Sequence, residues 1–218
     1  MDCCDHCQRI EHQFDLKKAK EKLKDYHDNG PQETTRLLVS ALIQRGVTDK
    51  TLLDIGGGIG AIQHELFKAG ISYATNLEAS QAYLQICREE ANRQGHGDRI
   101  HHIHGNFAEM KNMPQSDIVT LERVICCYPD WETLVEMSCQ KTRQLLGVVY
   151  PHEAWWVKLG MEMIYNLKFK LTRDPFRIYL HPTEHIHEKI LSHDFREIFF
   201  RKSGPWQVYV YAKKSLTT

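Results

Sequence analysis

Four glycines directly after an apolar run form the segment of this sequence that is best suited to hold a ligand. Residues 51–60 read TLLDIGGGIG, so a predicted strand runs through Asp54 into a glycine turn. Glycine lacks a Cβ atom, so this backbone can bend at positive φ and come close to a ligand, while the next helix points its N–H groups at it. The segment predicts a cradle for an adenosyl group. Its glycines are Gly56, Gly57, Gly58 and Gly60.

Two kinds of ligand fit this turn. Residues 56–61, GGGIGA, satisfy the relaxed dinucleotide pattern G-x-G-x-x-A, so a nicotinamide oxidoreductase is one alternative. Asp54 stands two residues before the first glycine, and a further carboxylate close to a pyrophosphate is unfavourable. Glu78 ends the next predicted strand, where a carboxylate can accept both ribose hydroxyls of either ligand. Asp54 therefore favours a ligand other than a dinucleotide.

The spacing D-x-G-x-G-x-G from Asp54 onward resembles motif I of the class I S-adenosylmethionine-dependent methyltransferases. The resemblance implies S-adenosyl-L-methionine as cofactor, with its amino-acid portion beside the glycine turn and its ammonium group near Asp54. It also implies an acid or amide beside the adenine, and Asn106 follows the third predicted strand at that place. The neighbours Ala79 and Phe107 are included among the expected cofactor-binding residues.

The stretch after the fourth predicted strand faces the cleft where a methyl group would be transferred. Here Glu122 is expected at the cofactor, Arg123 at an acidic substrate group or a structural carboxylate, and Tyr128 at the adenosyl pocket or in packing. Methyl transfer is a displacement that needs alignment, desolvation and sometimes a base, so no catalytic dyad is required. The N-P-P-Y signature of amino-group methyltransferases acting on DNA or protein is absent, which favours a small-molecule acceptor.

Residues 50–150, together with Tyr26 and the Gly30-Pro31 pair, resemble a bacterial group close to the magnesium-protoporphyrin O-methyltransferases. This resemblance implies that the N-terminal helices form a lid over the cofactor and that Tyr26 contacts its methionine end. The residues on the substrate side diverge, so the tetrapyrrole substrate is not carried over. His152, just past the fifth predicted strand, is a candidate for acid–base work alongside Arg123 and Tyr128.

The N-terminal cysteines Cys3, Cys4 and Cys7 are candidate ligands for a thiophilic metal, but one C-x-x-C pair is only half of a structural zinc site. We therefore expect no metal and reduced thiols. The cluster and the missing acceptor signature leave open a non-catalytic regulator that binds S-adenosylmethionine or a metal. If Cys126 or Cys127 joined such a cluster, a methyltransferase acting on a thiol-bound metalloid would be a further alternative.

Strand-like runs alternate with helical patterns from Lys50 onward, which is typical of a parallel sheet built from βαβ units. We expect a Rossmann-like α/β fold with seven strands, the last antiparallel, and helices on both faces. Residues 1–48 would form a helical extension and residues 49–218 one compact methyltransferase domain. Trp156, Leu159, Met163 and Leu167 share one side of a helix over 154–171 and are interpreted as core, with the alternative that this aromatic helix lines an apolar acceptor pocket. The predicted strands are 51–55, 72–77, 99–104, 117–121, 145–150, 195–201 and 207–212, and helices are predicted over 14–27 and 32–45, from near Gly60, Ser80 and Asp130, and over 183–192.

Composition excludes some partners. Lys and Arg number 28, as do Asp and Glu, so there is no overall excess of positive charge for nucleic acid or an anionic membrane. No apolar run reaches the roughly 18 residues of a membrane span, and no secretion signal is present. We expect a cytoplasmic protein that acts on a small molecule, in an oligomeric state that the sequence does not specify.

Overall fold

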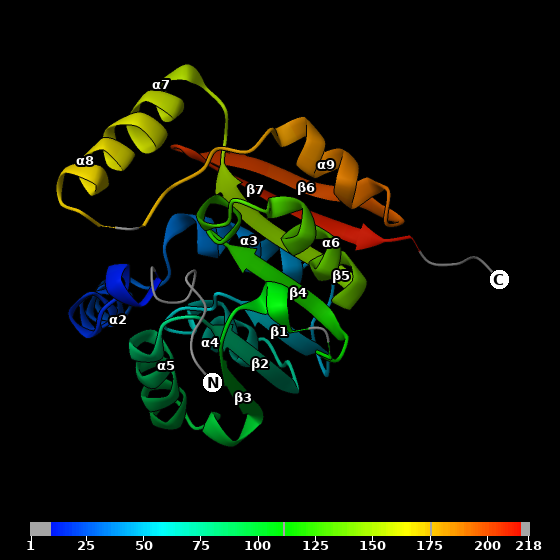
Figure 1. The fold of residues 1–218 in the computed structure, drawn as a ribbon. Coiled ribbons are helices and arrows are strands. Elements are labelled where there is room, and N and C mark those ends of the chain that lie inside the picture. The colour runs from blue at the N-terminus through cyan, green and yellow to red at the C-terminus, as the bar shows by residue number, and fades with distance from the viewer. Residues whose placement is uncertain (1–9, 111, 175, 215–218) are drawn as a thin grey trace.

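The computed structural model describes residues 10–110, 112–174 and 176–214, which form one twisted seven-stranded sheet with helices on both faces (Figure 1). The strand order is β3-β2-β1-β4-β5-β7-β6. The first five strands are parallel, and β7 runs antiparallel to both β5 and β6, which confirms the predicted mixed sheet. The strands are β1 (Thr51–Ile55), β2 (Tyr73–Glu78), β3 (Ile100–His104), β4 (Ser116–Glu122), β5 (Thr142–Pro151), β6 (Phe195–Ser203) and β7 (Trp206–Lys213).

The strand order reverses beside β1, and this reversal positions the site. The chain runs from β1 outward to β2 and β3, then returns to place β4 on the other side of β1. Ile55 at the end of β1 is paired with Leu77 in β2 and with Leu121 in β4. Ligands of open α/β sheets bind at such a switch point, outside the carboxyl ends of the strands.

The helices divide between the two faces of the sheet. Apolar residues of α3, α4 and α5 pack on one face, and those of α6 and α9 on the other. The helices predicted from near Ser80 and Asp130 begin there, because Ser80 accepts a hydrogen bond from the Tyr83 N–H and Asp130 accepts one from the Thr133 N–H as N-caps. The helices are α2 (Leu16–Asn29), α3 (Glu33–Ile43), α4 (Ala61–Lys68), α5 (Gln81–Arg93), α6 (Trp131–Lys141) and α9 (Thr183–Leu191), with short 3₁₀ turns η1 (Gly97–Arg99), η2 (Phe107–Glu109) and η3 (Ile125–Cys127).

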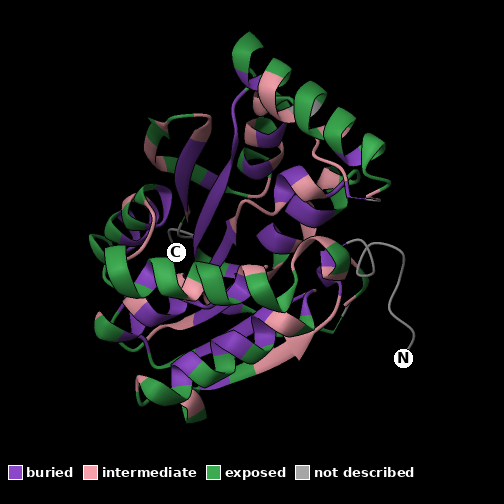
Figure 2. Ribbon diagram, turned by 90° about the vertical axis from the view of Figure 1, so that its left-hand side faces the viewer, coloured by how far each residue is buried: buried purple, intermediate pink, exposed green. Residues whose placement is uncertain are grey.

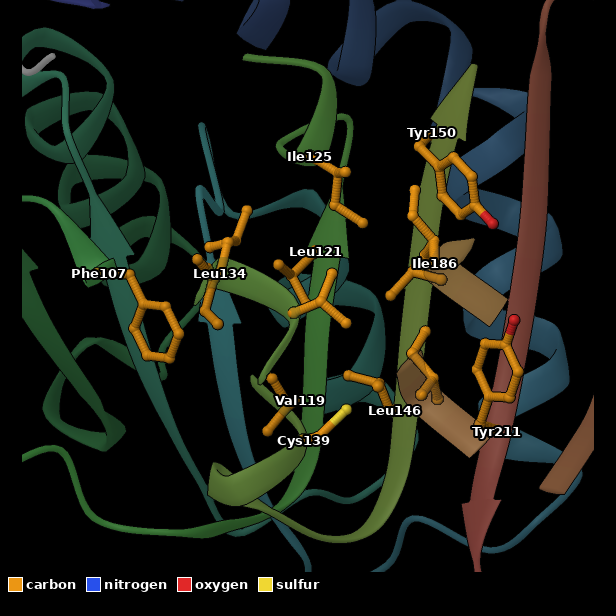
Figure 3. Close-up of a cluster of buried hydrophobic side chains, with 14 of the residues drawn as sticks. Phe107, Val119, Leu121, Ile125, Leu134, Cys139, Leu146, Tyr150, Ile186 and Tyr211 are labelled. Atoms are coloured by element: carbon orange, nitrogen blue, oxygen red, sulfur yellow. The ribbon is translucent and has the colours of Figure 1, made fainter. Parts of the chain in front are cut away.

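The core beneath α6 and α9 joins the two halves of the sheet (Figure 3). Leu121 in β4, Leu146 in β5 and Tyr211 in β7 are each fully buried and point toward residues of these helices, including Leu134 and Ile186. Burying such a side chain is worth about 1.5–3 kcal/mol relative to leaving it exposed. The strands whose ends form the site therefore rest on a continuous apolar layer.

One long helix departs from the sequence prediction. It comprises α7 (Trp155–Val157), the π-helical turns η4 (Lys158–Ile164) and α8 (Tyr165–Leu171), and it stands away from the sheet beyond the end of β5 (Figure 1). The interpretation of its apolar stripe as core is wrong, because Leu159 is 44% exposed and Met163 59% exposed. Figure 2 colours most of this helix, at the top of the view, as exposed. No helix of the described ranges is long and apolar enough to cross a bilayer.

Candidate functional site

Two cavities meet at the carboxyl edge of the sheet. The larger has a volume of about 780 Å³ and extends from the end of β2 to the long helix. The smaller, of about 150 Å³, lies between the glycine turn and the N-terminal helices. Their positions match the switch point of the fold. The residues that line both are Lys22, Gly56, Gly58, Tyr83, Glu122 and Arg123.

In the glycine turn, Gly56, Gly57 and Gly60 have room for hydrogen atoms only. A Cβ atom on Gly57 would lie 2.5 Å from Asn76 Oδ1, 2.5 Å from Gln63 Nε2 and 2.6 Å from Asp54 Oδ2. Gly56 has a φ of +63°, a conformation that side chains rarely adopt. The turn therefore presents bare backbone to the cavities on one side and covers a buried polar cluster on the other.

Asp54 belongs to that cluster and is 1% exposed. Its carboxylate accepts hydrogen bonds from Thr120 Oγ1 at 2.7 Å and from Gln63 Nε2 at 3.0 Å. Burial raises the pKa of Asp54 to about 7, although these two bonds act in the opposite direction. Asp54 also lines the smaller cavity, so a cation bound there would favour its ionised form.

Glu78 lies at the end of β2 and lines the larger cavity. Its Oε2 accepts the Gly58 N–H at 2.9 Å and its Oε1 accepts the Ser80 N–H at 2.9 Å. Burial raises the pKa of Glu78, while these backbone hydrogen bonds lower it. The bonds hold the carboxylate in place, and each oxygen has a second lone pair for a ligand hydroxyl.

Asn106 and Tyr128 are brought together next to the end of β3. The Tyr128 hydroxyl donates to Asn106 Oδ1 at 2.7 Å, and the same oxygen accepts the Ala108 N–H at 3.1 Å. Tyr128, like Ala79, lines the larger cavity. Phe107 instead lies in the core, where its ring is fully buried. Asn106 therefore fixes Tyr128 at the cavity wall.

Arg123 follows β4 in a left-handed conformation, with a φ of 60°. Its guanidinium donates to Thr34 Oγ1 and Gln32 Oε1 and stacks 4.6 Å from the centre of the Trp206 ring. Its Nε is buried without a hydrogen-bond partner in the described part of the chain. Partial burial and the positive charge of Arg123 lower the pKa of Lys22 on α2. Two cations thus stand together where the cavities meet.

Glu122 is held by the start of α3. Thr34 Oγ1 donates to it at 2.6 Å, and Thr35 Oγ1 lies 2.8 and 2.9 Å from its two oxygens. Glu122 lines both cavities. The contact joins the end of β4 to α3, whose Thr34 and Thr35 precede Glu122 by 88 and 87 residues in the chain.

Helix α2 covers the glycine turn. The Tyr26 hydroxyl donates to Glu65 Oε1 at 2.7 Å, His27 lies 3.0 Å from Glu90, and the Phe14 ring meets that of Tyr83 edge to face. Burial opposes ionisation of Glu90, but hydrogen bonds led by that from Arg93 lower its pKa to about 2. The N-terminal helices are thereby anchored to α4 and α5 above the smaller cavity.

The far side of the larger cavity is apolar. Its wall is built by the inner face of the long helix, by the segment that follows it and by the turn after β4. Hydrogen bonding to Cys126 and burial raise the pKa of Cys127 well above its ordinary value, so this thiol is not a nucleophile. The lining residues of this side include Cys126, Cys127, Val157, Met161, Tyr165, Phe169, Phe176 and Ile178.

His152 does not line either cavity as far as the described residues show. Its Nδ1 accepts the Ala154 N–H at 3.2 Å, and its Nε2 lies 3.1 Å from the carbonyl oxygen of Gly204. Both ring nitrogens are therefore paired with backbone, which gives His152 the role of tying the end of β5 to the final hairpin. The metal candidates Cys3, Cys4 and Cys7 lie outside the described residues.

Sequence reasoning missed the residues that reach the site from other segments. Lys22 falls within the helix predicted over 14–27, and Trp206 falls between the last two predicted strands, with no local sign that either reaches the site. Thr120 in β4 and Gln63 in α4 donate hydrogen bonds to Asp54, and neither belongs to a recognisable sequence motif. Only the assembled crevice reveals them.

Comparison with known proteins supports this description. A family model described as a methyltransferase domain matches residues 53–144. The ubiquinone biosynthesis O-methyltransferase of Pasteurella multocida is 27% identical over 168 residues, which cover 70% of this chain and 68% of that protein. Ribosomal protein L11 methyltransferase of Escherichia coli is 32% identical over 71 residues, covering 33% of this chain and 24% of that protein.

Among solved structures, magnesium protoporphyrin IX methyltransferase from Synechocystis with bound SAH superposes with a TM-score of 0.72 at 13% identity, covering 96% of this chain and 100% of that one. An O-methyltransferase family protein from Burkholderia thailandensis gives a TM-score of 0.65 at 13% identity, over 93% of this chain and 64% of that one. Family match and fold agree: residues 53–144 match a methyltransferase domain, and the fold is that of the class I methyltransferases. Its fold is similar to that of the magnesium-protoporphyrin enzyme, as its motifs suggested.

Proposed function

We propose that this protein transfers the methyl group of S-adenosyl-L-methionine to a small, largely apolar acceptor that occupies the far side of the larger cavity. The observation that carries the proposal is the border of six shared residues between the smaller cavity, which Asp25 and Asp54 also line, and the larger cavity with its apolar far wall. A sulfonium at this border would have its methionine end among charged groups and its methyl group toward the apolar wall.

The contacts on the cofactor side suit each part of S-adenosylmethionine. Glu78, held by two backbone N–H groups, would accept the ribose hydroxyls. Tyr128, positioned by Asn106, would lie against the adenosyl group. Asp54 would attract the ammonium group, and Lys22 with Arg123, whose buried Nε has no hydrogen-bond partner in the described part of the chain, would bind the carboxylate.

The N-terminal helices would serve as the lid. Tyr26 lines the smaller cavity while its hydroxyl bonds Glu65, so α2 closes over the methionine end of the cofactor. A lid that excludes water favours displacement at the sulfonium, since the acceptor atom loses its hydration shell before it attacks. Lys22 travels with α2, so closure would also bring a cation to the cofactor carboxylate.

The chemistry that remains for the protein is alignment. Displacement at a sulfonium needs the acceptor atom in line with the methyl carbon, and the apolar wall from Val157 to Ile178 would hold an acceptor by shape. Cys127 stays protonated and His152 is bonded to backbone, so neither is proposed as the base.

Calorimetric titration with S-adenosylmethionine, S-adenosylhomocysteine and NAD tests the cofactor. Glu78→Ala is expected to weaken binding of the first two by about 1–3 kcal/mol, because a paired carboxylate is lost. The matched control is Glu89→Ala, an exposed carboxylate on α5, which should leave affinity unchanged. Binding of NAD but not of the sulfonium would overturn the proposal.

Turnover is tested by following S-adenosylhomocysteine formation with a panel of apolar phenols, carboxylic acids and amines, with RNA as a comparison. The proposal expects methylation of at least one class of small acceptor. Tight cofactor binding with no methyl transfer to any of them would favour a regulator, and labelling of RNA alone would show that the acceptor is a nucleic acid.

A further inference from the structure

The outward face of the long helix carries an unpartnered apolar row. Every fourth residue of this helix is apolar and exposed, and we call the row the outer stripe. Trp155 is 77% exposed and Leu171 76%, which are high values for side chains of this size. No described segment covers them. The outer stripe consists of Trp155, Leu159, Met163, Leu167 and Leu171.

The π-helical turns explain why residues four apart stay in line. In an α-helix with 3.6 residues per turn, a repeat of four drifts around the axis. The segment Lys158–Ile164 has wider π-helical turns, so the repeat of four drifts there in the opposite sense and offsets the drift of the α-helical turns. The opposite row, Val157, Met161, Tyr165 and Phe169, then stays aligned too, and these four residues line the larger cavity.

The helix is therefore apolar on two faces. A helix that is apolar all round is normally buried, yet here only the inner row has a covering within the described chain. An exposed apolar row of this length marks an interaction surface. At 17 residues from Trp155 to Leu171 the helix is about 25 Å long, which suits lying along a surface.

The charges beside the outer stripe indicate which kind of partner the stripe would contact. Residues 155–174 contain four basic residues, Lys158, Lys168, Lys170 and Arg173, against two acidic ones, although the whole chain has 28 of each sign. All four basic residues are exposed. Asp174, one of the two acids, accepts the Phe176 N–H and lies 3.6 Å from His12, so it is engaged with the body of the protein. The balanced total charge conceals a local positive surface.

We propose that the outer stripe docks on an anionic lipid surface. The helix would lie in the interface with Trp155 and the leucines among the acyl chains and its lysines at the headgroups. A second copy of this chain is a poorer occupant, because a two-fold contact through the stripe would bring the same lysines face to face. Since the inner row of the same helix lines the acceptor cavity, docking would place that cavity next to the lipid phase.

This placement extends the proposed function, because the acceptor would then be a lipid-soluble molecule that enters from the bilayer. This statement about the acceptor rests on the proposed function. The docking itself is independent of methyl transfer. Vesicle binding is measured without acceptor, and turnover is measured separately, so failure of one proposal is distinguishable from failure of the other.

The test is sedimentation of the full chain with vesicles of phosphatidylcholine alone and of phosphatidylcholine mixed with phosphatidylglycerol. Wild type should sediment with the mixed vesicles at low salt and less with the neutral ones. The double variant Leu159→Asp with Leu167→Asp should bind the mixed vesicles at least about tenfold more weakly than wild type, since two carboxylates would enter the apolar layer. The control Leu191→Asp, an exposed leucine on α9, should bind like wild type.

A second variant separates charge from apolar contact. Lys168→Glu with Lys170→Glu should remove the preference for anionic vesicles, and circular dichroism with S-adenosylmethionine titration verifies the fold of every variant. Failure of wild type to sediment with either vesicle overturns the proposal. Vesicle binding by the Leu159/Leu167 double variant that equals that of wild type also overturns the proposal. A third contrary result would be a wild-type dimer in sedimentation velocity that the double variant disrupts, together with no binding of wild type to vesicles.

Discussion

The two sides of the crevice differ in how their polar groups are satisfied. On the cofactor side, Asp54 and Glu78 are buried and each accepts two hydrogen bonds from the protein before any ligand binds. On the side proposed for the acceptor, the larger cavity is walled by rings, aliphatic side chains and the protonated thiol of Cys127. The long helix that forms this wall is itself exposed on its outer face.

This difference follows from what each ligand demands. A charged cofactor requires fixed groups, because a buried carboxylate that lacks partners is costly and would neutralise itself. An apolar acceptor requires shape and exclusion of water, which rings and aliphatic groups on a less tightly held helix can supply. Under the proposed function, the side with fixed polar groups would serve a single ligand and the apolar side a class of ligands.

The largest effect that would test the contrast is expected from Gly57→Ala. The new Cβ atom would lie within 2.6 Å of three polar atoms, so the turn or the cluster must shift. Overpacking of this kind costs about 1–3 kcal/mol of unfolding free energy, and cofactor binding should be lost with it. Urea unfolding and calorimetry measure both, and an alanine variant with wild-type stability would show that the cluster is not tightly packed.

The next effect is a pH dependence of cofactor affinity. Because burial raises the pKa of Asp54 to about 7, the free protein takes up a proton there as pH falls, while a bound ammonium group favours the carboxylate. Affinity for S-adenosylmethionine should therefore fall by up to about tenfold per pH unit below pH 7. Asp54→Asn should bind weakly and without this pH dependence; a wild-type affinity that is flat from pH 8 to pH 5.5 would contradict the assignment.

The same residue affects stability with the opposite sign. Its folded pKa lies above the unfolded value of 3.8, so the protonated folded state is favoured and this contribution to stability is complete below pH 3.8. It is lost as pH rises through about 7. Urea unfolding of wild type and Asp54→Asn across this range isolates the contribution by difference.

A smaller effect is expected on the acceptor side. Tyr165→Ala removes a ring that lines the larger cavity, and it should raise the KM for the acceptor by about fivefold, or about 1 kcal/mol, with cofactor affinity unchanged. Tyr73→Ala, a comparably exposed tyrosine on β2, is the control. An equal loss of cofactor affinity in the Tyr165 variant would show that the two sides are not separate.

The smallest effect is expected from Gly160→Ala, the counterpart of the first substitution. Gly160 lines the larger cavity within the π-helical turns, and a Cβ atom there would meet nothing within 4 Å in the described structure. Alanine should raise the unfolding free energy by about 0.5–1 kcal/mol, since glycine loses more backbone freedom on folding. A destabilised variant would mean that the long helix needs the flexibility of this residue.

Much of the fold was predictable because it depends on local rules. Apolar runs of strand length, the caps at Ser80 and Asp130 and the turn through Gly204 each follow from residues a few positions apart, and all are present in the structure. The long helix was predicted as a helix, but its stripe was assigned to the core. Periodicity locates an apolar face without saying whether anything covers it.

The sequence by itself determined the glycine turn with Asp54, the acidic end of β2 and the order of strands and helices, since each depends on neighbours along the chain. Only the tertiary structure decided that Lys22 meets Arg123, that His152 is bonded to backbone and that the outer stripe faces outward. The physical reason is that these features depend on contacts between segments far apart in the chain, and these contacts form only when the sheet and its helices pack.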